Sequence, residues 1–276
     1  FFFKQKPAYE IPLRLVGSEM CIRDRIIATD LDGTIYLQSK IIPGVKDSIH
    51  EAKNNNFKFI FITNNSSETP YQIKNKLENM LSNEIDLNDI VSPLVILKDY
   101  LKNFDKKIYV HGSYNLQKYV KTITTELFPI DKSEIILIGR TDSFSKHDVE
   151  SIADAFNRGV DVIAMNKDLT FPINDHEFKD GNGAIVREIE SLVGSSINSF
   201  GKPDSFYSEY LLKQFPKIFA VIGDRVDTDI LLAKDIDAKS YLVDSSIKNY
   251  LDEKIADFKF DTFSQSVSSI IKNSKN

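Results

Sequence analysis

The sequence is poor in cysteine, in long apolar runs and in excess positive charge. Its 276 residues include one cysteine, Cys21, which excludes a disulfide within the chain and a metal site built from thiolates. Its longest apolar runs, such as residues 218–222, fall far short of the roughly 20 residues that cross a bilayer. The net charge of −5, without any Lys/Arg cluster, argues against a nucleic-acid partner. We therefore expect a cytoplasmic protein that binds neither nucleic acid nor a membrane.

The first 25 residues are unlike the rest of the chain. They have neither helical nor strand periodicity, contain no apolar core long enough for a signal peptide, and closely resemble a translated sequencing adapter. We expect residues 1–25 to be non-native, Cys21 included, and base the expected fold on residue 26 onward. The overall composition, 42% apolar and 27% charged, is ordinary for a globular protein.

Short apolar strands alternate with helical segments along the chain. This alternation predicts βαβ units around a parallel sheet, and therefore an α/β fold. Strands are expected at residues 25–29, 57–63, 108–111, 135–139, 160–166, 218–223 and 240–243. Helices are expected at residues 45–54, 70–81, 147–158 (with Ser145 as N-cap), 183–193, 205–214, 228–234 and 263–272.

The strongest chemical signal is the motif DLDGT, which begins at Asp30 and directly follows an apolar strand. Ligands of parallel sheets bind at the carboxyl ends of the strands, where Asp30 and Asp32 would lie. The alternative is a turn that merely caps the strand. A calcium loop is excluded because Gly33 is at the fourth position of the motif and Ile41 replaces the bidentate glutamate. We favour the chemical interpretation.

Three further motifs follow in order. Thr63-Asn64-Asn65 ends a strand and offers hydroxyl, amide and backbone N–H donors, although an ordinary polar turn has the same composition. Lys202, in the motif GKP, precedes an expected helix, where most lysines are simply solvated. The stretch GDRVDTD, which includes Asp224 and Asp229, follows another strand and indicates a hard cation with oxygen ligands. A helix N-cap would explain Asp229 but not Asp224.

Together these motifs stand in the order, and at the strand ends, of the four motifs of the haloacid dehalogenase superfamily. The sequence resembles in particular the NagD and 4-nitrophenylphosphatase-like enzymes of subfamily IIA, which carry a C2-type cap. The resemblance covers residues 26–276 and rests on DLDGTIY (30–36), IPG (42–44), TNNSS (63–67), MNKD (165–168), GNGA (181–184), GKP (201–203) and GDRVDTDI (223–230). Asp180 departs from the family, which usually has proline there.

The spacing of the motifs predicts an inserted domain. Lys202 lies 139 positions after Thr63 but only 22 before Asp224. A βαβ crossover takes about 30 residues. We therefore expect a Rossmann-like core at residues 26–101 and 198–276, and an inserted α/β C2-type cap at residues 102–197.

The resemblance implies a Mg²⁺-dependent phosphatase for small phosphorylated metabolites. In such an enzyme Asp30 is the nucleophile that becomes phosphorylated, and Asp32 is the general acid and base. The Mg²⁺ ligands implied are Asp30, the carbonyl of Asp32 and Asp224, with Asp229 as a candidate for the outer coordination shell. Thr63, Asn64 and Lys202 are implied to hold phosphoryl oxygens.

The resemblance also implies that the cap sets specificity. Asn166, Asp168 and a loop at residues 171–183 would face the substrate, and His176 in that loop is a candidate contact for the leaving group. The remaining histidines, at positions 50, 111 and 147, have no ligand spacing and are expected to be structural. Caps of this type often pair, so a homodimer through the cap is a further expectation.

Three alternatives compete with hydrolysis. A phosphotransferase or mutase would use the same scaffold, and a catalytically silent module would only bind a phosphorylated metabolite. Intact Asp30, Asp32, Lys202 and Asp224 argue against the silent module. A dinucleotide site at the glycine motif of residues 181–183 fails, because Val186 stands where the third glycine belongs.

Overall fold

The structure is a computed structural model that describes residues 25–102, 105–141, 144–174, 177–215, 217–245, 249 and 251–274. Residues 1–24, which include Cys21 and nearly all of the segment expected to be non-native, lie outside these ranges. No helix of the described ranges is long and apolar enough to cross a membrane.

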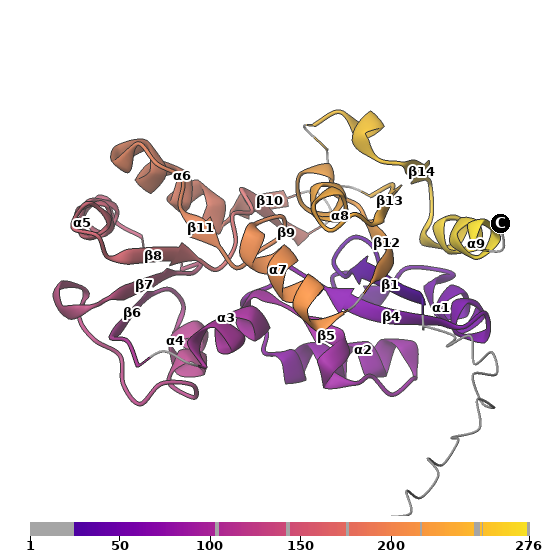
Figure 1. The fold of residues 1–276 in the computed structure, drawn as a ribbon, viewed down its shortest axis with the longest axis horizontal. Coiled ribbons are helices and arrows are strands. Elements are labelled where there is room, and N and C mark those ends of the chain that lie inside the picture. The colour runs from indigo at the N-terminus through magenta and orange to yellow at the C-terminus, as the bar shows by residue number, and fades with distance from the viewer. Residues whose placement is uncertain are drawn as a thin grey trace, which may run out of the picture.

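The largest sheet of the described residues is a six-stranded parallel sheet (Figure 1). Its strand order is β14-β13-β12-β1-β4-β5, and every neighbouring pair is parallel. The strands are β1 (Arg25–Asp30), β4 (Phe57–Ile62), β5 (Ile90–Val91), β12 (Ile218–Gly223), β13 (Lys239–Val243) and β14 (Phe258–Phe260). β1, which ends at Asp30, therefore lies between β4 and β12 at the centre of the sheet.

Helices cover both faces of this sheet, so its central strands are apolar on both sides. On one face, Ile27 packs in a cluster with Phe59 and Ile222 and with side chains of α1 (Val45–Asn54), α2 (Pro70–Leu81) and α9 (Phe263–Asn273). On the other face, Ala28 and Ile60 pack with α3 (Pro93–Leu101), α7 (Ser205–Gln214) and α8 (Leu231–Asp235). This two-sided burial is why these strands are nearly continuous apolar runs rather than alternating ones.

A second, four-stranded parallel sheet comes from the middle of the chain. Its order is β11-β8-β7-β6, and its strands are β6 (Ile108–His111), β7 (Ile135–Ile138), β8 (Asp161–Ala164) and β11 (Asn198–Ser199). α4 (Tyr114–Val120), α5 (Lys146–Asn157) and α6 (Asn182–Val193) accompany it. Two hairpins complete the strands, β2 (Tyr36–Leu37) with β3 (Lys40–Ile41) and β9 (Thr170–Asn174) with β10 (Glu177–Asp180). The predicted fold class, a parallel-sheet core with an inserted α/β unit, is confirmed.

The two sheets share one hydrophobic cluster, which includes Leu94 and Leu97 of α3 together with Val110 and Leu137 of the smaller sheet. At the junction the rings of Tyr100, Phe200 and Phe206 lie with all three centroid separations between 5.2 and 5.4 Å. The inserted unit is therefore packed against the core by apolar contacts rather than held by its chain connections alone.

Several helices begin where the sequence provides a cap. Ser145 caps α5 and forms a capping box with Asp148, as Thr69 does with Gln72 for α2 and Thr262 with Gln265 for α9. Residues 228–234 are helical as expected, but the helix changes form along them. A π-helical turn, Val226–Ile230, precedes the short α8 there. The expected loop at residues 171–183 contains most of the β9–β10 hairpin and the start of α6.

The edge strand β14 is tied to β13 by a hydrogen-bonded carboxylate. Asp257 Oδ2 accepts hydrogen bonds from the backbone N–H and the hydroxyl of buried Ser240, at 2.9 and 2.8 Å, and Oδ1 lies 3.0 Å from Lys234 Nζ. Burial alone would raise the pKa of Asp257, but these hydrogen bonds and Lys234 outweigh it and lower the pKa to about 2.

We predict that Asp257→Asn lowers the free energy of unfolding by about 1–2 kcal/mol at pH 7, because the charge-assisted hydrogen bonds are lost. The folded pKa lies below the unfolded value of 3.8, so this stabilisation is present above about pH 4 and disappears as the pH falls toward 2. Urea unfolding of both proteins between pH 2 and pH 7 tests this. An unchanged difference across that range would contradict the assignment.

Candidate active site

The carboxyl ends of three adjacent strands bring together the polar residues that follow them. β12, β1 and β4 are neighbours, and they end at Gly223, Asp30 and Ile62. Asp224 directly follows β12, and Thr63 directly follows β4. These acids and hydroxyls are buried, although strand ends usually face solvent.

Lys202 lies between two carboxylates. Its Nζ donates to Asp30 Oδ1 at 2.5 Å and to Asp229 Oδ1 at 2.6 Å, and the lysine is only 3% exposed. Burial would lower the pKa of Lys202, but Asp229 and Asp30 raise it above its ordinary value. Lys202 is therefore charged and is an internal counter-ion rather than a solvated surface lysine.

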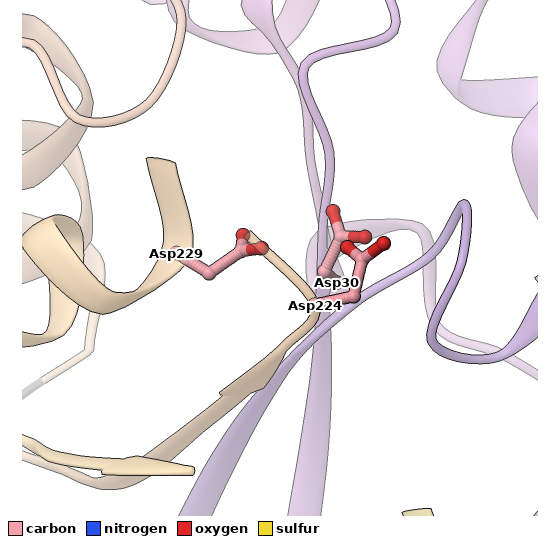
Figure 2. Close-up of side chains that lie close together, drawn as sticks. All are labelled: Asp30, Asp224 and Asp229. Carbon is pink, nitrogen blue, oxygen red and sulfur yellow. The ribbon is translucent and has the colours of Figure 1, made fainter. Parts of the chain in front are cut away.

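Asp224 completes a cluster of three buried acids. Oxygens of Asp30, Asp224 and Asp229 lie within 4.8 Å of one another. Figure 2 shows the three side chains converging from the end of β1, the end of β12 and the helical turn that follows β12. The turn is the π-helix, which places Asp229 toward the strand ends; its Oδ2 accepts the backbone N–H of Arg225 at 3.1 Å.

Gly33 is required by the position of Asp224. Its φ is +93°, which disfavours other residues, and a Cβ there would lie 2.2 Å from Asp224 Oδ2. The glycine of the DLDGT motif thus lets the turn after β1 pass directly against a metal-ligand candidate.

The cluster has the charge and donor atoms for a divalent cation. When all three carboxylates are ionised they carry three negative charges, of which Lys202 neutralises one. Among the described residues no hydrogen bond reaches either buried oxygen of Asp224, although Ser245 lies near enough to lower its pKa. A buried charge without a partner is costly, and oxygen ligands suit Mg²⁺. The residues therefore fit Mg²⁺, and Asp229 lies near enough to Asp30 and Asp224 to be part of the same cluster.

Burial shifts the titration of these acids. It raises the pKa of Asp30 well above the ordinary value; Lys202 opposes this rise, whereas Asp229 and Asp224 add to it. Burial and the charge of Asp229 raise the pKa of Asp224 to about 7. Both shifts have the sign expected for like charges gathered in a region of low polarity, which a bound cation would reverse.

Asp32 has a different environment from Asp30. It is exposed to solvent, and its Oδ2 accepts a hydrogen bond from the Tyr36 hydroxyl at 3.3 Å. Desolvation by the surrounding protein nevertheless raises the pKa of Asp32, and the positive charge of Lys76 opposes that rise. Lys76 Nζ lies 3.9 Å from the centre of the Tyr36 ring. Tyr36, although it ends the DLDGTIY motif, and Lys76 were not recognised as site residues, since nothing in the sequence indicates that they lie beside Asp32.

The loop after β4 connects the site to the smaller sheet. Asn64 Oδ1 accepts the backbone N–H of Lys202 at 2.6 Å, and Asn64 Nδ2 donates to Asp168 Oδ1 at 2.9 Å. Asn166 Nδ2 donates to the carbonyl of Asn64 at 2.8 Å. The structure thus brings Asn166 and Asp168 to the site, whereas His176 lies outside the described residues.

A further buried residue, Tyr207, holds the Thr63 loop. Its hydroxyl donates to the carbonyl of Val91 at 2.8 Å and accepts the backbone N–H of Thr63 at 3.1 Å. Tyr207 lies on α7, and its role depends on a contact 144 positions away in sequence. Sequence patterns alone could not have identified it.

Comparisons with known proteins match both halves of this site. The family of haloacid dehalogenase-like hydrolases matches residues 27–126, and a second, HAD-hydrolase-like family matches residues 199–269. Both ends of the chain are thus similar to haloacid dehalogenase-like hydrolases. The two matches contain the DLDGT motif with Thr63 and Asn64, and Lys202 with Asp224 and Asp229, on either side of the inserted unit.

Relatives of this family are similar over nearly the whole chain. An acid sugar phosphatase of Staphylococcus haemolyticus is 24% identical over 257 residues, which cover 89% of this chain and 96% of the relative. Phosphoglycolate phosphatase 2 of Arabidopsis thaliana is 27% identical, covering 88% and 91%. The p-nitrophenyl phosphatase of Archaeoglobus fulgidus has the same fold, with a TM-score of 0.77, 22% identity and coverage of 89% and 99%. The 4-nitrophenylphosphatase of Thermotoga maritima has a TM-score of 0.75 and 23% identity, covering 90% and 98%.

Replacing Asp224 by Asn tests the cation site without reference to catalysis. The substitution removes one buried negative charge, so at pH 8 in EDTA we expect the variant to be more stable than the wild type by roughly 2 kcal/mol. Saturating Mg²⁺ should stabilise the wild type, by about 2.7 kcal/mol at 100 times Kd, and the variant much less. Thermal unfolding with EDTA and with Mg²⁺ measures both effects. An equal Mg²⁺ effect on the two proteins would contradict the site.

Proposed function

We propose that the chain is a Mg²⁺-dependent phosphatase that hydrolyses phosphate monoesters of small metabolites through a phosphorylated Asp30. The observation that carries this proposal is the placement of Asp30, at the end of β1, against the buried charge of Lys202 and within a cluster of acids that fits a divalent cation. The similarity to acid sugar phosphatases and phosphoglycolate phosphatases supports phosphate monoesters as the substrate class.

Asp30 and Asp224 would hold the ion, with the carbonyl of Asp32 as a further ligand and Asp229 in the outer coordination shell. When bound, Mg²⁺ neutralises charge on the acids and on the phosphoryl group. Positioning and charge neutralisation account for most of the catalysis of phosphoryl transfer, which has little other chemistry for the protein to perform. Lys202 and the hydroxyl of Thr63 would hold phosphoryl oxygens, and Asn64 would contribute its backbone N–H.

In the first step, a carboxylate oxygen of Asp30 attacks phosphorus. The new O–P bond forms on Asp30 as the bond from phosphorus to the alcohol oxygen breaks. Asp32 gives its proton to the departing oxygen, which leaves as an alcohol. The exposure of Asp32 to solvent supports this assignment, because the leaving group must reach it from outside.

In the second step, water attacks the phosphorus of the aspartyl phosphate. Asp32, now ionised, takes a proton from that water as the new O–P bond forms. The bond from phosphorus to Asp30 breaks, and inorganic phosphate and the carboxylate of Asp30 are regenerated. Asp32 thereby ends the cycle protonated, as it began.

Steady-state hydrolysis of p-nitrophenyl phosphate tests the proposal. We expect phosphate release by the full chain with Mg²⁺ and none in EDTA. Asp30→Asn should abolish turnover, and Asp32→Asn should reduce kcat roughly 10²- to 10⁴-fold, the usual contribution of general acid–base catalysis. Wild-type rates in either variant would refute the assigned roles. No release from folded, Mg²⁺-loaded protein, with this ester and with a panel of phosphorylated metabolites, would refute hydrolysis itself.

Tyr36→Phe tests whether the Tyr36 hydroxyl orients Asp32 for proton transfer. An alkyl phosphate such as glycerol phosphate needs a proton on its leaving oxygen, whereas p-nitrophenolate leaves without one. We therefore expect the variant to lose about tenfold in kcat/KM with the alkyl ester and much less with the nitrophenyl ester. An equal loss with both esters would show that Tyr36 acts only through the general structure of the site.

A further inference from the structure

The side chain of Asn64 is surrounded by protein partners. One Nδ2 hydrogen is directed at Asp168 Oδ1, 2.9 Å away, and the other at the carbonyl of Lys202, 3.2 Å away. Its Oδ1 accepts the backbone N–H of Lys202 at 2.6 Å. Asn64 is 8% exposed. With both amide hydrogens directed at protein, the side chain has no remaining donor for a phosphoryl oxygen.

Asp168 reaches Asn64 from the inserted unit. It follows β8, an inner strand that pairs with β7 and β11 in the smaller sheet. Its backbone N–H lies 3.4 Å from Asn166 Oδ1, and Asn166 in turn donates to the carbonyl of Asn64. The carbonyl of Asn166 accepts from Asn182 Nδ2 at 2.8 Å, which fixes this segment to the start of α6. Asp168 is therefore held in place by residues of the inserted unit.

Backbone packing keeps these segments together. A Cβ on Gly201 would lie 2.8 Å from Asn166 Cβ and 3.1 Å from Asn64 Oδ1. The glycine before Lys202 thus allows the lysine backbone to approach both asparagines. Three segments that are far apart in the sequence meet at this point. They are the loop after β4 of the larger sheet, the segment after β8 of the smaller sheet, and the segment that returns from the inserted unit to the core.

We propose that Asp168 and Asn64 form a latch between the inserted unit and the core that sets the position of Lys202. Asp168 is then a positioning residue, because it acts through Asn64 on the backbone of the lysine whose Nζ contacts Asp30. Its carboxylate serves as a hydrogen-bond acceptor for Asn64 rather than as a charge that recognises substrate. This role rests on the proposed phosphatase function for its effect on rate, but not for its effect on structure.

Two substitutions of Asp168 distinguish the latch from a substrate contact. Asp168→Asn keeps an oxygen that can accept from Asn64 Nδ2, so kcat/KM for p-nitrophenyl phosphate should stay within about threefold of the wild type. Asp168→Ala leaves a buried amide hydrogen without a partner, so kcat/KM should fall about tenfold or more. Equal losses in the two variants would indicate that the charge itself matters and would overturn the latch.

A reciprocal exchange provides rescue. Asn64→Asp sets two carboxylates against each other and should lower kcat/KM by more than tenfold. Adding Asp168→Asn restores a donor and an acceptor across the junction, and the double variant should recover several-fold over Asn64→Asp alone. Failure to recover in a folded double variant would contradict direct coupling. Asp161→Asn, which removes the charge of an exposed ion pair with Lys106 on the same sheet, is the matched control.

Amide hydrogen exchange tests the latch without turnover. The N–H of Lys202 should exchange faster in Asp168→Ala, because its acceptor Asn64 is no longer held, and at the wild-type rate in Asp168→Asn and Asp161→Asn. Unchanged protection in Asp168→Ala would overturn the latch even if rates fell. If the wild type shows no turnover, the proposed phosphatase function fails, and this exchange experiment still decides the latch.

Discussion

The buried carboxylate of Asp30 is the constraint on which the rest of the site depends. A carboxylate that is removed from water needs a compensating charge. Lys202 provides one such charge at 2.5 Å, but it is shared with Asp229, and Asp224 adds a third acid nearby. The arrangement is therefore incompletely neutralised by protein alone. A divalent cation would neutralise this excess of negative charge, which would otherwise repel an anionic phosphoryl group.

The fold satisfies this constraint through the order of its central strands. The carboxyl ends of adjacent parallel strands lie at the same edge of the sheet. The turn after β1 and the acids after β12 therefore lie close together without a long connecting loop. Gly33 permits the close approach of the β1 turn to Asp224, and the π-helical turn directs Asp229 into the same space. Lys202 enters from the segment that returns from the inserted unit, so the position of the counter-ion is linked to how that unit sits against the core.

The sequence predicted the parts of this site that depend on local patterns. Burial on both faces of the sheet makes the strands that end at Asp30 and Gly223 continuous apolar runs, which can be recognised in the sequence. Lys202 and Asp224 were recognised from the order of the motifs. Contacts such as Asn64 with Asp168, 104 positions apart, leave no such signal. The π-helical turn was taken for an ordinary helix, since a one-residue change in hydrogen bonding hardly alters the apolar period. Predictions for the substrate contacts of the cap and for a homodimer through it stay predictions.

The central claim is a covalent phosphoryl group on Asp30, and trapping it is the most direct measurement. Asp32→Asn protein would be mixed with Mg²⁺ and p-nitrophenyl phosphate, quenched in acid, and analysed by peptide mass spectrometry. Asp32→Asn removes the base that activates water, so the second step slows and the adduct accumulates. The account predicts a phosphoryl adduct on the peptide that contains Asp30, and none when Asp30 is also replaced by Asn. Release of p-nitrophenol without any such adduct, or an adduct on another residue, would contradict it.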